Sequence, residues 1–115
     1  MHELSIAVSI VDAATEEAER LGESRVEAVH LRLGVLAGVA ERALQDCFEL
    51  ACRQTPLEGS RLVIQSVPIL VDCPSCSEAR PVTSMQSFTC ASCGTPGTRV
   101  VAGKELQIVA LEVPS

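Results

Sequence analysis

Four of the six cysteines in this 115-residue chain form two Cys-x-x-Cys pairs. The pairs are Cys73 with Cys76 and Cys90 with Cys93, separated by the thirteen residues 77 to 89. Each pair has the spacing of a knuckle whose turn directs two sulfurs, and some backbone amides, at one point. Four thiolates around a divalent ion form a closed tetrahedral shell, and zinc accepts that geometry without redox chemistry. The spacing therefore predicts a structural zinc site with no open position for activating water.

The segment that carries these pairs, residues 71 to 103, is rich in proline and glycine and poor in apolar residues. A segment of this length cannot hold itself together by hydrophobic burial alone. Zinc binding, which supplies on the order of 10 kcal/mol or more of folding free energy, can replace the missing core. Three alternatives use the same cysteines: a dithiol redox pair, an iron site and a coincidence of spacing. Colour and metal analysis would distinguish an iron site from a zinc site.

The first three residues, Met1-His2-Glu3, form a second candidate metal site. A histidine at the second position can chelate a divalent ion through its ring and its own backbone nitrogen. The resulting nitrogen-rich, near-planar set suits Ni(II) or Cu(II) and suits zinc poorly. A terminal histidine is more often only a solvated residue, and His30, on the polar side of a predicted strand, is interpreted as a surface residue.

Hydrophobic periodicity predicts the elements that must position these groups. Apolar residues at helical spacing indicate two helices, and alternating or continuous short apolar runs indicate three strands. The helices are predicted at residues 4 to 21 and about 40 to 54, and the strands at 25 to 33, 61 to 67 and 105 to 113. The fold class predicted is α+β, with two helices packed on a small three-stranded sheet and an inserted zinc-ribbon-like four-cysteine module. Residues 1–70 plus 104–115 would form an α/β domain that carries the candidate nickel site at its start, and 71–103 the inserted zinc-binding domain.

Several positions in these elements carry more detailed predictions. Alternation in the first strand places Val29, Leu31 and Leu33 on one face, opposite His30 and Arg32. Gly22 is expected to close the first helix in a left-handed conformation. The last strand is apolar on both faces, which predicts that it is buried within the sheet. Cys47 and Cys52, which do not share a helical face, are interpreted as small hydrophobic residues in or near the core.

Composition excludes several classes of function. Apolar residues make up 47% of the chain and aromatic residues 2%, so the core must be aliphatic. A formal charge of −6 repels phosphate backbones, which argues against a nucleic-acid partner. No apolar run reaches the length of a membrane span and no secretory signal is present, so the chain is predicted to be soluble and cytoplasmic, with no membrane partner. No nucleophile and base pair, phosphate loop or paired-carboxylate site is found, so an enzyme is not expected.

Several short motifs, taken in order along essentially the whole chain, resemble the HypA/HybF family of nickel-insertion proteins for nickel–iron hydrogenase. The tripeptide at the start of the chain, combined with a four-cysteine insertion, is the most specific part of the resemblance. The matching segments are Met1-His2-Glu3-Leu4-Ser5, Leu33-Gly34, Gly38-Val39, Glu58-Gly59, the two cysteine pairs and Gly103-Lys104-Glu105-Leu106. Ser77 departs from the pattern, because glycine is common at that position.

The resemblance implies a metallochaperone that passes nickel, together with a nickel-binding GTPase, to the hydrogenase large subunit. It implies that His2 is the essential nickel ligand, helped by backbone nitrogens of the first residues, and that Glu3 is required. Zinc would be held by the four paired cysteines, and a further carboxylate for nickel would have to be Glu41. Family members can also serve urease, so urease maturation proteins are further expected partners, and a homodimer is left open.

Two rival functions use the same sequence features. The first is a structural zinc-ribbon adaptor that binds protein partners without nickel chemistry. The second is a rubredoxin-like electron carrier, which would contain iron and be coloured as purified. Replacing His2 with Ala discriminates the adaptor, because nickel binding would then be unchanged.

Overall fold

A computed structural model describes residues 2–114 of the chain. It divides into two compact units, each built from segments that are not continuous in sequence. The first unit comprises Met1–Arg32, Val39–Gln65 and Gln107–Ser115, and the second comprises Leu33–Gly38 and Ser66–Leu106.

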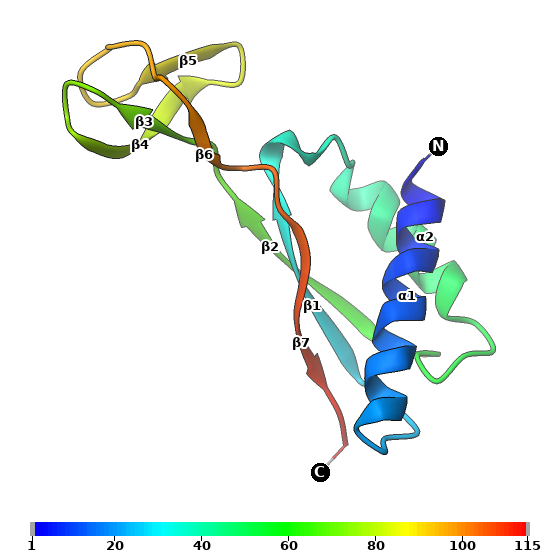
Figure 1. The fold of residues 1–115 in the computed structure, drawn as a ribbon. Coiled ribbons are helices and arrows are strands. Elements are labelled where there is room, and N and C mark those ends of the chain that lie inside the picture. The colour runs from blue at the N-terminus through cyan, green and yellow to red at the C-terminus, as the bar shows by residue number, and fades with distance from the viewer. Residues whose placement is uncertain (1, 115) are drawn as a thin grey trace. The chain divides into compact units, whose positions relative to one another are not determined.

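The first unit contains two helices and most of a three-stranded sheet. The helices pack against each other and lie on one side of the sheet, whose strand order is β2-β1-β7 (Figure 1). The elements are α1 (His2–Arg20), β1 (Ala28–Gly34), α2 (Glu41–Cys52), β2 (Arg61–Val67) and β7 (Leu106–Glu112). This arrangement confirms the predicted α+β fold of two helices on a small sheet.

The core of this unit is aliphatic, with Phe48 as its one buried aromatic residue among the residues described. On β1, Val29, Leu31 and Leu33 are buried, whereas His30 and Arg32 are only half-buried. The predicted alternation of this strand is therefore confirmed. His30 is not simply a surface residue, because its Nε2 lies 2.5 Å from the Glu112 carboxylate.

Two positions in this chain require glycine, one for its left-handed backbone and one for a close approach of another segment. Gly22 follows α1 with φ of 77°, and the Glu23 amide bonds to the Ala18 carbonyl at 2.8 Å, which confirms the predicted left-handed helix end. A side chain at Gly34 would place its Cβ 2.1 Å from the Gly103 carbonyl oxygen. The short 3₁₀ helix η1 (Val35–Ala37) follows.

The predicted burial of the last strand is wrong. Leu106 is 41% and Val109 is 51% exposed, and no residue of β7 is fully buried. The sheet order places β7 at an edge, so it pairs with a neighbour on one side only. The helices also lie on one side of the sheet, so an apolar residue facing the other side has nothing to pack against.

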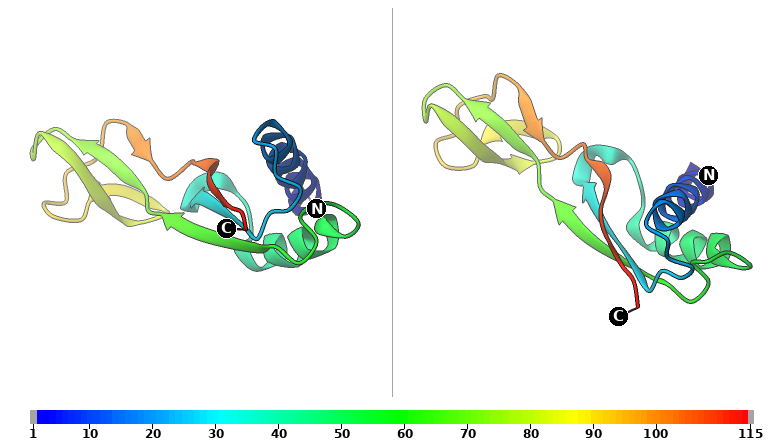
Figure 2. Two further views of the ribbon diagram at one scale, coloured as in Figure 1. Left: turned by 90° about the horizontal axis from the view of Figure 1, so that it is seen from below. Right: turned by 60° about the horizontal axis from the view of Figure 1, so that its bottom comes forward.

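The second unit contains a four-stranded sheet that the sequence did not predict in detail. Its strand order is β5-β4-β3-β6, and Figure 2 shows these strands in two further views. The strands are β3 (Leu70–Cys73), β4 (Glu78–Ser84), β5 (Ser87–Cys90) and β6 (Val100–Ala102). Val71 is 1% exposed, but most side chains of β4 and β5 are exposed or half-buried, so this sheet has little apolar core. Among residues 2–114, no helix is long and apolar enough to cross a membrane.

Candidate metal centre

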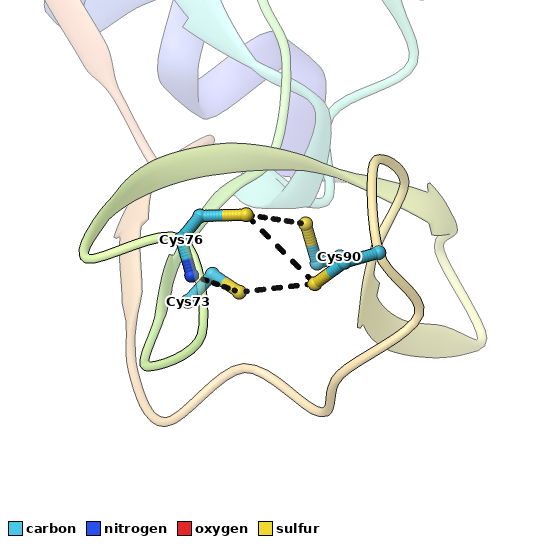
Figure 3. A group of neighbouring side chains, drawn as sticks. Cys73, Cys76 and Cys90 are labelled. Carbon is cyan, nitrogen blue, oxygen red and sulfur yellow. Dashed lines mark hydrogen bonds between the residues drawn. The ribbon is translucent and has the colours of Figure 1, made fainter.

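The four paired cysteines converge on one point in the second unit. Their sulfurs all lie within 4.8 Å of one another. Figure 3 shows the side chains of Cys73, Cys76 and Cys90 pointing toward one another. The individual distances are 3.5 Å between Cys73 and Cys93, 3.9 Å between Cys76 and Cys90, and 3.8 Å between Cys76 and Cys93. None of these cysteines is in a disulfide.

These separations fit a tetrahedral metal ion. A tetrahedron of sulfurs about 2.3 Å from a central zinc has edges of about 3.8 Å. The observed sulfur distances lie close to that edge length, and they are far too long for the bond of about 2.05 Å in a disulfide. Thiolates are ligands for zinc and for iron, so the cluster could hold a metal ion.

Two matching turns aim the sulfurs. In the first knuckle the Cys76 amide donates to the Cys73 sulfur at 3.4 Å, and the Ser77 amide donates to the Cys73 carbonyl at 2.8 Å. In the second, the Gly94 amide donates to the Cys90 carbonyl at 2.8 Å. Both turns end in the left-handed region, with φ of 60° at Ser77 and 79° at Gly94.

Because Ser77 adopts a conformation that disfavours side chains, Ser77→Gly is expected to stabilise the second unit. We expect a gain of about 1 kcal/mol, and a loss of about the same size for the reciprocal Gly94→Ala. Open space surrounds Gly94, so that loss would come from its φ alone and not from a clash. The chelator concentration at which half of the zinc-loaded protein is unfolded measures the stability change of each variant. If Ser77→Gly lowered this concentration, the backbone at Ser77 would not be strained.

The four sulfurs are not electrostatically equivalent. Hydrogen bonds from the Thr95 hydroxyl and amide lower the pKa of Cys93 to about 6. At Cys90 burial opposes ionisation, but the amides of Cys93 and Ser92 bring the pKa below its ordinary value. The Arg80 guanidinium favours the Cys76 thiolate, yet hydrogen bonds with neighbouring thiols and burial raise the pKa of Cys76 to about 11. A divalent ion would remove this competition for protons by holding all four as thiolates.

The start of α1 carries the other predicted metal ligands. His2 begins the helix and its side chain is 56% exposed, whereas Glu3 is only 15% exposed. The Ala40 amide at the start of α2 donates to Glu3 Oε2 at 3.2 Å, and this hydrogen bond lowers the pKa of Glu3. His2 Nε2 lies 3.5 Å from the same carboxylate oxygen. The structure therefore brings His2 and Glu3 together at the N-terminus of α2; Met1 lies outside the described residues.

The other residues considered from the sequence belong to the first unit. Glu41 is exposed and is the first residue of α2, directly after Ala40. Cys52 is buried, and burial raises the pKa of its thiol to about 11, so it behaves as the small core residue expected. Cys47 is half-buried.

Sequence reasoning missed two residues of the centre. Thr95, two positions after the second knuckle, bonds to the Cys93 sulfur at 3.2 Å and to Ser75 Oγ at 2.9 Å, linking the knuckles. A hydroxyl directly after a Cys-x-x-Cys-Gly turn is a local signal that could have identified it. Arg80 contacts Cys76 from β4, and no spacing rule points to it.

The two helices on a small sheet, together with a tetrahedral group of four sulfurs, define a small α+β protein with a zinc-ribbon-like metal-binding module. Residues 1–113 match the family model described as "HypA: Hydrogenase/urease nickel incorporation, metallochaperone, hypA". The hydrogenase maturation factor HypA of Chloroflexus aurantiacus is 46% identical over 114 residues, covering 99% of this chain and 100% of the relative. The corresponding protein of Geobacter metallireducens is 45% identical over 113 residues, covering 98% of this chain and 99% of the relative.

Solved structures show the same fold. The solution structure of the Ni metallochaperone HypA from Helicobacter pylori matches with a TM-score of 0.69 and 20% identity, covering 98% of this chain and 97% of that one. A second solution structure, also of a HypA protein, gives a TM-score of 0.72 at 20% identity and covers 99% of this chain and 97% of that one. This chain belongs to the HypA family of hydrogenase and urease nickel-incorporation metallochaperones.

Proposed function

We propose that this protein binds Ni(II) at its N-terminus and delivers it, with a partner nickel-binding GTPase, to the large subunit of nickel–iron hydrogenase. Membership of the family supports the nickel role. The observation that carries the proposed location is the placement of an exposed His2 beside a Glu3 carboxylate fixed by the Ala40 amide. That contact orients the first turn of α1. Urease maturation proteins are alternative recipients.

We further propose that Cys73, Cys76, Cys90 and Cys93 hold a permanent zinc ion. Residues 71–103 would then be a zinc-binding domain inserted into a nickel-binding domain of residues 1–70 plus 104–115. The sulfur separations support a closed shell, which stabilises the fold but leaves no position for catalysis. Nitrogen ligands at an exposed helix start would exchange their ion more readily. The thiolate site would therefore keep its zinc ion while the nitrogen site passes its nickel ion on.

Metal analysis of the untagged protein, followed by nickel calorimetry, tests this function. We expect one tightly held zinc per chain as purified, and one further nickel bound weakly enough to be removed by a competing chelator. A protein that holds zinc but takes up no nickel would instead support the zinc-ribbon adaptor. Iron in place of zinc would support the electron carrier.

Nickel uptake is expected to release protons and to strengthen as pH rises, because a coordinating imidazole and backbone nitrogens must lose their protons before the ion binds. Glu3 is not the source of this dependence. Its pKa is lowered in the folded chain, so its stabilising contact is fully present above its ordinary value of 4.5 and is lost only as pH falls below that.

The variant Glu3→Gln separates these contributions. It should weaken nickel binding about threefold to tenfold, because the amide accepts the Ala40 hydrogen bond less strongly than a carboxylate does. The pH at which uptake is half-maximal should not move. Calorimetry in two buffers of different ionisation enthalpy counts the released protons, and nickel binding without proton release would contradict a nitrogen-based shell.

A further inference from the structure

A basic side chain lies against the cysteine cluster. Arg80 is on β4, directly across from Val71 on β3, so both side chains project from the same face of this antiparallel pair. Val71 is 1% exposed, which places the stem of Arg80 on the buried face. The guanidinium pairs with Glu78 Oε2 at 2.6 Å, and it lies near the Cys76 sulfur, where its positive charge favours the thiolate.

The Nε atom of Arg80 is buried and lacks a hydrogen-bond partner. It is the one buried side-chain nitrogen or oxygen without a hydrogen-bond partner in the part of the chain that the structure describes. A buried, unpartnered donor on a cation is destabilising unless negative charge lies nearby. Glu78 supplies one negative charge to the guanidinium, and four thiolates with one divalent ion would add a net charge of −2.

We propose that Arg80 is the cationic partner of the metal–thiolate centre, shielding the Cys76 sulfur and slowing its attack by electrophiles. This inference rests on the proposed zinc site. Hydrogen bonds to a metal-bound sulfur draw electron density from it and make it a weaker nucleophile. Arg80 is thus a tuning residue: it lowers the nucleophilicity of the Cys76 sulfur without being a ligand of the ion. Cys93 is the one exposed cysteine among the four, and its hydrogen bonds come from Thr95 and not from a cation.

Iodoacetamide, a neutral reagent, tests the proposal on the full-length zinc-loaded protein. A zinc-bound sulfur forms a bond to the reagent's methylene carbon while the carbon–iodine bond breaks and iodide leaves. The neutral thioether is a poor ligand, so zinc is released and a colorimetric chelator reports it. We expect wild-type protein to be alkylated first at Cys93, as identified by mass spectrometry of the first modified species.

Arg80→Met should release zinc about fivefold faster, the change expected when one partly exposed charged contact is lost, and should bring Cys76 among the first residues modified. Arg80→Lys keeps the charge without the planar donor group and should fall between the two, which also provides a milder variant if Arg80→Met folds poorly. Glu78→Gln removes the ion pair of Arg80 but leaves the guanidinium, so it should not accelerate release.

Arg99→Met is the matched control. Arg99 pairs with Asp72 at 2.9 Å in the same unit, so its loss changes the net charge equally without a contact to a cysteine sulfur. An unchanged rate and order of modification in both Arg80 variants, or equal acceleration by Arg99→Met, would overturn the role of Arg80. Absence of zinc from the wild-type protein would instead overturn the proposed zinc site, and the two failures are therefore distinguishable.

Discussion

Replacing Cys90 with Ser is expected to abolish stable zinc binding and to unfold the second unit. Cys90 is 1% exposed, and a serine hydroxyl at this position neither ionises nor binds zinc as a thiolate does. The sheet of this unit has little apolar core, so we expect its folding to depend on the metal, which would contribute on the order of 10 kcal/mol. Removing zinc with a strong chelator should have the same effect. Zinc content and the dispersion of amide resonances from β3, β4, β5 and β6 measure the loss.

The first unit supplies the internal control for this experiment. Its aliphatic core does not involve the four paired cysteines, so resonances from α1 and α2 should retain their dispersion. Cys47→Ser is the matched variant, because Cys47 is half-buried in α2 and lies outside the cluster. It should bind zinc as the wild-type protein does. A Cys90→Ser protein that keeps both zinc and a folded second unit would show that the cluster does not stabilise this module.

Inserting one alanine between Met1 and His2 is expected to reduce nickel affinity by more than about 100-fold, because the chelate of the imidazole with early backbone nitrogens depends on its position at the terminus. His2→Ala should have an effect of the same size. Zinc content should remain unchanged in both variants, since His2 is not part of the cysteine cluster. Calorimetry on untagged, zinc-loaded protein measures the affinity.

His30→Ala is the control for this second experiment. It removes the other histidine of the chain, which is held by Glu112 on the sheet. Nickel affinity should stay within about twofold of the wild-type value. If His30→Ala weakened nickel binding as strongly as His2→Ala, or if the inserted alanine had no effect, the terminal location of the site would be wrong.

Periodicity was sufficient where a pattern is local. The helices and the buried face of β1 follow from side-chain spacing, because burial against one neighbouring layer repeats every 3.6 or every two residues. The four-cysteine group was also predictable, since two short knuckles each fix their own pair of sulfurs and four thiolates can share one ion.

Properties that depend on neighbours distant in sequence were not predictable in this way. Apolar character on both sides of β7 suggested burial, but burial was decided by the strand's place at a sheet edge. The strands of the second unit lack a clear apolar alternation, because this sheet encloses little core.

What the sequence alone determined is therefore the set of donors: four sulfurs at knuckle spacing, and a histidine and a carboxylate at the start of the chain. Only the tertiary structure decided what surrounds them. It brought the Glu3 carboxylate to the Ala40 amide, 37 residues away, and Arg80 to the Cys76 sulfur. The physical reason is that ligand identity is a property of single side chains and short turns, whereas their electrostatic environment is a property of chain packing.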